Sequence, residues 1–154
     1  MEINTSLSNL QINKFTPNIG AEIICKNVFE NLSSSICDEI YKSLIENKVI
    51  FFRDQKISPL HHINFAKSFG DIEPPHPVYP HLDKFPEIVL LENDDKKPPD
   101  TDEWHTDLTF RPNPPFASIL YSKIIPQYGG DTLWTCLTSI YEACLLYTSP
   151  SPRD

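Results

Sequence analysis

Two residues of types that bind metal ions lie two positions apart in the second half of the chain: His105 and Asp107, in the sequence Trp-His-Thr-Asp. If this segment is a β-strand, residues i and i+2 point to the same face, so the imidazole and the carboxylate emerge side by side. One imidazole and one carboxylate are two of the three ligands of a two-histidine, one-carboxylate facial triad, which leaves positions open on Fe(II). The spacing therefore fits a mononuclear metal site.

A His-x-Asp tripeptide also arises by chance, and alone it favours a simpler interpretation, a His and an Asp hydrogen-bonded on the surface of a strand. The neighbouring residues favour the metal site. Trp104 and the Leu-Thr-Phe run at 108–110 indicate a half-buried strand. A charge on the inner face of such a strand is costly unless it is paired or bound to a metal.

Short strands must position these side chains, and runs of β-branched and aromatic residues between turn residues predict them. The expected strands are 10–13, 19–25, 49–52, 87–91, 104–110, 116–124 and 131–135. Strands fill the second half without a regular alternation with helices. We therefore expect a mostly β fold with peripheral helices, an antiparallel sandwich or jelly roll.

Two helices are expected in the first half of the chain. The first begins near Ser35, which starts a capping-box pattern, and ends at Asn47. The second begins after the N-cap residue Ser58 and ends at Gly70. The two histidines at 61–62 lie on this second helix and are expected to face solvent.

The composition excludes some classes of partner. The 154 residues include 13 Lys and Arg against 21 Asp and Glu, a net charge of −8. Without a basic face or a run of basic residues, neither nucleic acid nor an anionic membrane is expected as the main partner. The N-terminus carries no signal pattern, so a cytoplasmic location is expected. The four cysteines form no CxxC pair and are expected to be buried free thiols.

The residues around His105 belong to a longer pattern. The motifs, in chain order, are Phe-Arg-Asp-Gln at 52–55, Phe-Gly at 69–70, His-Pro-Val-Tyr-Pro-His at 76–81, Trp-His-Thr-Asp-Leu-Thr-Phe at 104–110, Pro-Pro at 114–115 and Gly-Gly-Asp-Thr-Leu-Trp at 129–134. With these motifs in this order, the chain resembles the taurine catabolism dioxygenase family. Its members are Fe(II)- and 2-oxoglutarate-dependent oxygenases. The resemblance runs from about residue 10 to residue 142, and it implies a double-stranded β-helix, a jelly roll.

The resemblance also implies roles for individual residues. His105 and Asp107 would be iron ligands, and Thr132 would donate a hydrogen bond to a carboxylate of 2-oxoglutarate. His76 and Tyr79 would line the substrate pocket, where an imidazole and a phenol can donate to a sulfonate. From the residues alone, Thr132 is better explained as a plain strand threonine, whereas His76 is explained equally well as a loop histidine held by prolines. His81 has no role that the resemblance assigns.

Thr101 marks a departure from the family pattern, because close taurine enzymes carry an asparagine near the substrate amine at this place. The chain is expected to bind substrate there with a shorter side chain that has no amide. Taurine and another small sulfonate therefore both stay open as the substrate.

A second departure concerns the distal ligands of the family. Its second metal histidine and two anion-binding arginines lie in a C-terminal half, whereas no histidine follows Asp107 here and the only later arginines are Arg111 and Arg153. We interpret residues 1–143 as the N-terminal part of a dioxygenase domain, a partial jelly roll truncated before its C-terminal half. Residues 144–154, rich in Ser and Pro, are interpreted as a non-homologous, artefactual or disordered tail, with a genuine short isoform as the alternative.

The expected function of the full-length protein is hydroxylation of taurine or a related small sulfonate with release of sulfite, using Fe(II), 2-oxoglutarate and oxygen. One alternative is a related dioxygenase for another small anion, such as an aryloxyalkanoate. The other is an inactive fragment, because two ligands hold Fe(II) more weakly than three. The expected partners are these small molecules, and a homo-oligomer is compatible with the full-length form.

Overall fold

A computed structural model of the chain describes residues 10–26, 28–30, 32–94, 96–98 and 103–145. The chain divides into two compact units. The first combines residues 1–56 with 125–154, and the second comprises residues 57–124. Among the described residues, no helix is long and apolar enough to cross a membrane.

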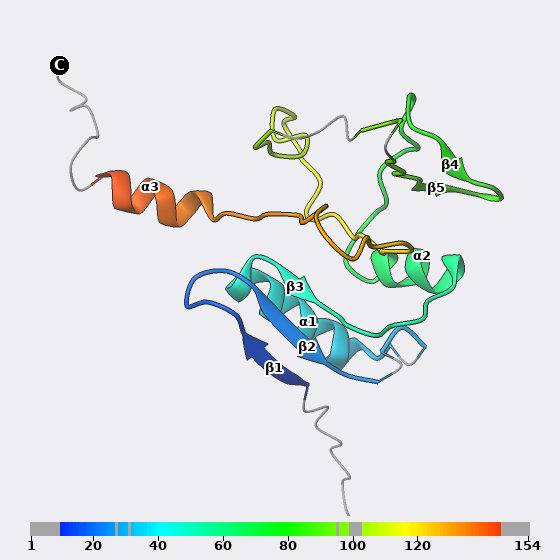
Figure 1. The fold of residues 1–154 in the computed structure, drawn as a ribbon. Helices are drawn as coiled ribbons and strands as arrows, with labels where there is room; N and C mark the ends of the chain where they lie inside the picture. Colours follow the sequence, from blue (N-terminus) through cyan, green and yellow to red (C-terminus); the bar gives the residue numbers. More distant parts are fainter. Residues whose placement is uncertain (1–9, 27, 31, 95, 99–102, 146–154) are drawn as a thin grey trace, which may run out of the picture. The chain divides into compact units, whose positions relative to one another are not determined.

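The first unit contains a three-stranded sheet with the order β1-β2-β3 (Figure 1). Strands β1 (Gln11–Lys14) and β2 (Ala21–Ile24) form an antiparallel hairpin, and β2 also pairs in parallel with β3 (Ile50–Phe51). Helix α1 (Ser34–Asn47) makes the crossover between the two parallel strands. Parallel neighbours need such a crossover, because a tight turn cannot join them.

The turn of the hairpin comprises residues 15–20, between β1 and β2. The Thr16 hydroxyl donates to the Ile19 carbonyl at 2.6 Å and accepts from the Ile19 N–H at 3.0 Å. Gly20 follows with φ of 89°, a left-handed conformation that glycine adopts without the steric cost of a Cβ. The Phe15 N–H then closes the turn on the Gly20 carbonyl at 2.9 Å. The predicted first two strands are confirmed with shifted ends.

Helix α1 ends at Asn47 as predicted but begins earlier than expected. Its N-cap is Ser33, whose hydroxyl accepts from the Ile36 N–H at 3.3 Å, and Ser35 lies inside the helix. The expected cap at Ser35 is therefore wrong. Both serines have the right chemistry, and the extended backbone of Ser33 decides between them.

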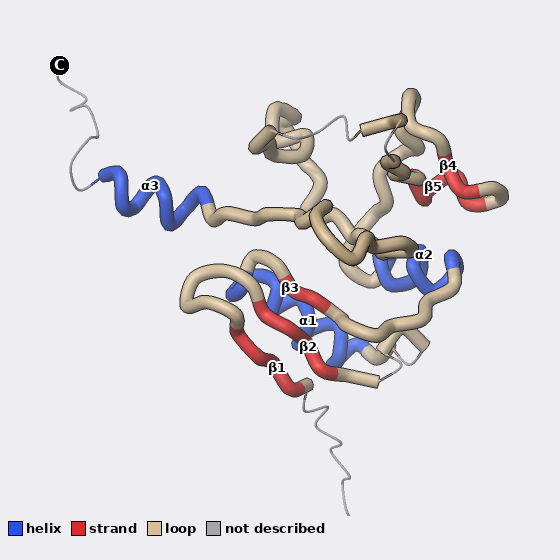
Figure 2. The backbone as a smooth tube through the Cα atoms, in the orientation of Figure 1, coloured by secondary structure: helices blue, strands red, loops and turns tan. Residues whose placement is uncertain are grey.

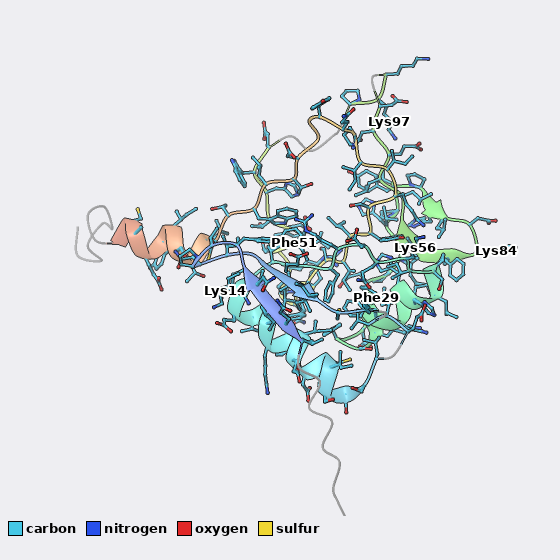
Figure 3. All side chains as sticks on the ribbon, turned by 60° about the horizontal axis from the view of Figure 1, so that its bottom comes forward. Lys14, Phe29, Phe51, Lys56, Lys84 and Lys97 are labelled. Atoms are coloured by element: carbon cyan, nitrogen blue, oxygen red, sulfur yellow. The ribbon has the colours of Figure 1, made fainter. Side chains whose placement is uncertain are left out.

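The core of the first unit lies between α1 and one face of the sheet (Figure 2). Ala21 and Ile23 are two positions apart on β2 and are 0% and 1% exposed, and Ile40 of α1 is 1% exposed. The alternation of buried residues along β2 is that of a strand with one face on the core. The Phe51 ring, labelled among the side chains in Figure 3, lies 5.4 Å from that of Phe15.

The second unit begins with α2 (Pro59–Lys67), followed by a hairpin of β4 (His81–Leu82) and β5 (Phe85–Val89). The Ser58 hydroxyl caps α2 by accepting from the His61 N–H at 3.1 Å, as predicted. The helix ends at Lys67 rather than near Gly70.

Ser68 is the C-cap residue of α2. The Ser68 hydroxyl donates to the Asn64 carbonyl at 3.0 Å and so satisfies one of the last carbonyls of the helix. The predicted strand at 87–91 is found two residues earlier, as β5. The tight turn at Asp83 and Lys84 sets this register, with φ of 64° at Lys84. Figure 3 labels Lys84 at the tip of the hairpin.

Three predicted strands are wrong. Segments 104–110, 116–124 and 131–135 form bends, turns and irregular backbone, and none of them pairs with a strand among the described residues. A strand is stable only when a neighbour satisfies its N–H and C=O groups, and a sequence pattern does not supply that neighbour. Loops make up most of the described chain, with short strands and few helices, so the jelly roll stays a prediction.

Helix α3 (Leu137–Leu145) was not expected, and the predicted boundary at 143/144 stays a prediction. Cys144 belongs to this helix, so the boundary falls inside a regular element. Residues 146–154 lie outside the described part of the chain. The prediction that the four cysteines are buried is wrong, because Cys144 is exposed and the other three are only partly buried.

Candidate functional site

The side chains of His105 and Asp107 lie together in the second unit, with His105 Nε2 and Asp107 Oδ1 3.4 Å apart. His105 Nδ1 lies 3.0 Å from the Glu103 carbonyl oxygen. A carbonyl can only accept, so Nδ1 carries the hydrogen and Nε2 of the neutral ring keeps its lone pair. A histidine binds a metal ion through such a lone pair. His105 can therefore offer Nε2, the nitrogen nearer the Asp107 carboxylate, as a metal ligand.

A bend, not a strand, brings the pair together. Leu108 has φ of 54°, a left-handed conformation that is uncommon and costly for a residue with a Cβ. The Arg111 N–H donates to the Leu108 carbonyl at 3.1 Å, which closes a turn directly after Asp107. The predicted proximity of the two side chains is thus found, although the predicted strand is not.

Ser118 holds the other oxygen of the candidate carboxylate ligand. Its hydroxyl donates to Asp107 Oδ2 at 3.2 Å, while Oδ1 is the oxygen nearer His105. Partners of this kind orient metal-binding carboxylates and tune their affinity. Sequence reasoning missed Ser118, and the available signal was a single serine in the otherwise apolar run 116–120.

The segment that carries Ser118 is fixed to α2 by His62. His62 Nε2 donates to the Ile119 carbonyl at 3.2 Å, and the His62 ring lies 6.5 Å from the Tyr121 ring. The prediction that His62 faces solvent is wrong, because this side chain is half-buried. Burial lowers the pKa of His62, and the hydrogen bond to the Ile119 carbonyl partly opposes that shift.

His76 and Tyr79, the predicted substrate residues, also lie together in the second unit. Their ring centroids are 4.7 Å apart. His76 Nδ1 accepts from the backbone N–H groups of Val78 and Tyr79, both at 3.2 Å. The neutral His76 ring therefore carries its hydrogen on Nε2 and can donate it to a ligand, since His76 is exposed.

The described structure does not test the two remaining predicted site residues, Thr132 and Thr101. Thr132 is exposed and belongs to the first unit, whereas the candidate metal ligands belong to the second. Thr101 lies outside the described residues. The roles of both residues stay predictions.

The side chains of His105 and Asp107 can be compared with the three protein ligands of a facial-triad Fe(II) site. Within the described part of the chain, no three His, Cys, Asp or Glu side chains are grouped to hold a metal ion. His105 and Asp107 nevertheless fit two ligand positions, because one nitrogen lone pair and one carboxylate oxygen lie 3.4 Å apart. The outer atom of each group is hydrogen-bonded, to the Glu103 carbonyl and to the Ser118 hydroxyl.

Comparison with curated proteins finds two relatives whose names refer to sulfate esters or alkyl sulfates. The chain is 38% identical over 141 residues to a protein named alkylsulfatase of Acinetobacter baylyi, covering 91% of this chain and 44% of the relative. It is 36% identical over 135 residues to an alpha-ketoglutarate-dependent sulfate ester dioxygenase of Pseudomonas putida, covering 86% of this chain and 44% of the relative. The chain thus spans under half the length of these two relatives.

A solved structure shows the same similarity. The chain matches a Burkholderia xenovorans protein assigned as an alpha-ketoglutarate-dependent taurine dioxygenase with a TM-score of 0.73 and 35% identity, over 86% of this chain and 47% of that one. Residues 11–146 also match the family model described as "Taurine catabolism dioxygenase TauD, TfdA family". The resemblance inferred from the motifs is confirmed, and the chain belongs to the TauD/TfdA family of dioxygenases.

Proposed function

We propose that the protein containing these residues is an Fe(II)- and 2-oxoglutarate-dependent dioxygenase that oxidises a small organic sulfonate or sulfate ester. The observation that carries the proposal is the pairing of His105 Nε2 with Asp107 Oδ1 at 3.4 Å in a chain of this family. The relatives named for sulfate esters and for taurine support the substrate class.

The chain's own residues divide the work between metal and substrate. His105 and Asp107 would hold Fe(II), while the Glu103 carbonyl and the Ser118 hydroxyl keep both side chains oriented. When bound, Fe(II) and 2-oxoglutarate supply the oxygen chemistry that converts a substrate C–H bond to C–OH. The protein's contribution is to position these groups and the substrate.

His76 and Tyr79 would receive the anionic end of the substrate. His76 Nε2–H is a donor, because Nδ1 is occupied by two backbone N–H groups. A tetrahedral sulfonate or sulfate group accepts such hydrogen bonds. Hydroxylation of the carbon that bears the anionic group gives a product that releases sulfite or sulfate and leaves an aldehyde.

Taurine and alkyl sulfates are the two substrates to separate. The sulfate ester is favoured by the relatives at 38% and 36% identity, and taurine by the solved structure at 35% identity. A different small anion is a second candidate, because the chain is also 28% identical over 141 residues to a 2,4-dichlorophenoxyacetate dioxygenase of Cupriavidus pinatubonensis.

The test is turnover by the full-length gene product with Fe(II), 2-oxoglutarate, oxygen and either taurine or a medium-chain alkyl sulfate. We expect succinate together with sulfite or sulfate, and loss of both products in His105→Ala and Asp107→Ala. His61→Gln is the matched histidine control and should keep wild-type turnover. Equal turnover in His105→Ala, or turnover of neither compound, would contradict the proposal.

A further inference from the structure

The imidazole of His81 ties the end of the segment 76–81 back to its beginning. His81 Nε2 lies 2.8 Å from the carbonyl oxygen of His76. Because a carbonyl only accepts, Nε2 of His81 carries the hydrogen and donates it. The histidine that begins the segment is thus held through its own backbone carbonyl by the histidine that ends it.

The second ring nitrogen of His81 adds no further hydrogen bond within the part of the chain that the structure describes. His81 Nδ1 is buried and has no hydrogen-bonding partner among the described residues. A buried acceptor without a partner loses its hydration and gains nothing in return. The hydrogen bond to His76 is therefore the polar contact by which the His81 side chain contributes to this segment.

The ring of His76 is held from its other side by the same segment. Its Nδ1 accepts from the N–H groups of Val78 and Tyr79, both at 3.2 Å. The segment is also fixed to the residue that follows β5, because the Leu90 N–H donates to the Pro80 carbonyl at 2.8 Å. His81 is the first residue of β4, where it pairs with Val89 of β5.

These contacts couple His81 to the direction of the His76 ring. A change in the peptide group after His76 would move the N–H groups of residues 78 and 79 relative to Nδ1. Losing those donors would free the ring to rotate and to move its hydrogen from Nε2 to Nδ1. The hydrogen on Nε2 is the one that the proposed function needs for the substrate anion.

We propose that His81 is a positioning residue for recognition of the substrate anion, acting through the His76 carbonyl to keep His76 Nε2–H available as the donor. This inference rests on the proposed function for its substrate, but the geometry that it predicts at His76 is measurable without turnover. It assigns a role to a histidine whose own ring does not need to contact substrate or metal.

Five variants separate the effect of the hydrogen bond from the effect of the side chain's shape. His81→Gln places an amide N–H as many bonds from the backbone as His Nε2, so it can keep the bond to His76. His81→Asn carries the same amide one bond closer and cannot reach, and His81→Phe keeps a ring without a donor. His76→Ala, alone and combined with His81→Asn, reports whether the two residues act together.

The kinetic readout is the split between KM and kcat in the full-length gene product. We expect His81→Asn and His81→Phe to raise the KM for the sulfonate or sulfate ester by about tenfold, the effect of one lost hydrogen bond to a charged group. The kcat and the KM for 2-oxoglutarate should change little, and His81→Gln should restore the substrate KM. In the His76→Ala background, His81→Asn should add nothing.

Equal KM values for His81→Gln and His81→Asn would overturn the inference, as would a full additional effect of His81→Asn in the His76→Ala background. The second readout is the ring nitrogen spectrum of His76 by NMR. Nε2–H should dominate in wild type and His81→Gln but not in His81→Asn, and the same tautomer in all three would also overturn it. A wild-type protein that turns over neither substrate would contradict the proposed function, and the spectrum would still decide on His81.

Discussion

An ion pair joins the segment before His76 to the turn after Asp107: Arg111 Nη1 lies 2.6 Å from Glu73 Oε2. Glu73 precedes His76 by three residues, and Arg111 follows Asp107 by four. The pair thus links the stretch with the proposed anion donor to the stretch with the candidate metal ligands. Arg111 lies on the wrong segment to be one of the anion-binding arginines that the resemblance implies, and the structure gives it Glu73 as a partner.

The Glu73–Arg111 pair should contribute little to stability, because both side chains are more than a third exposed. We expect Arg111→Ala to lower the free energy of unfolding by about 1 kcal/mol or less. The measurement is a double-mutant cycle with Glu73→Gln by urea unfolding at low and high salt. A coupling energy well above about 1 kcal/mol that does not change with salt would contradict the prediction.

Ser118→Ala should weaken metal binding without preventing folding. The hydroxyl donates to Asp107 Oδ2, and the loss of such an outer partner typically lowers metal affinity about 10–100-fold. Titration of the full-length gene product with Mn(II) or Co(II) by calorimetry gives the affinity directly. Ser118→Thr keeps the hydroxyl and is the matched control, which should bind close to wild type. Equal affinity in the alanine and threonine variants would show that this hydrogen bond does not matter.

The half-buried His62 should make stability depend on pH. Burial lowers its pKa in the folded protein, so below the ordinary pKa of about 6.5 the unfolded chain binds more protons at this site than the folded chain. Stability contributed by His62 is therefore present at pH 7.5 and falls as the pH drops through 6.5 toward 5.5. Urea midpoints of wild type and His62→Gln across this range measure the effect.

The His62→Gln variant keeps all other titrating groups in place, so the pH dependence of its urea midpoint reports the contribution of those groups. Its midpoint should fall less steeply with decreasing pH than that of wild type. A parallel pH dependence in the two proteins would contradict the lowered pKa of His62.

The 154-residue chain by itself is expected to show no turnover. Among the residues that the structure describes, only two candidate ligands, His105 and Asp107, are grouped, and metal affinity falls with each missing ligand. The assay is release of sulfite from taurine, or of sulfate from an alkyl sulfate, with Fe(II), 2-oxoglutarate and oxygen. Product at the rate of the full-length gene product would show that the chain supplies a complete site.

Local patterns were enough to predict the first half of the fold. The turn at Thr16, the cap at Ser58 and the end of α1 at Asn47 depend on residues within a few positions of one another. Ser33 replaced Ser35 as the cap of α1 because both side chains can accept the bond and only backbone geometry separates them. Such choices shift an element by a turn at most.

The second half could not be predicted in the same way, because its contacts are distant in sequence. The 104–110 segment has the composition of a strand, yet Leu108 has a positive φ, and no residue pattern signals that. Ser118 contacts Asp107 across eleven positions, and His62 contacts the Ile119 carbonyl across 57. The resemblance to a family indicated which residues belong to the site, but the partners that orient them emerged only from the structure.

The central position of β2 has a consequence for the order in which the first unit folds. Its pairing with β1 closes a six-residue turn region and is local, so this hairpin can form in about 1–10 μs. Its pairing with β3 brings together Ala21 and Ile50, and the loop between them must close before any hydrogen bond forms. Helix α1 shortens that loop when it forms, so we expect the parallel pair to complete last, on the template that the hairpin and α1 provide.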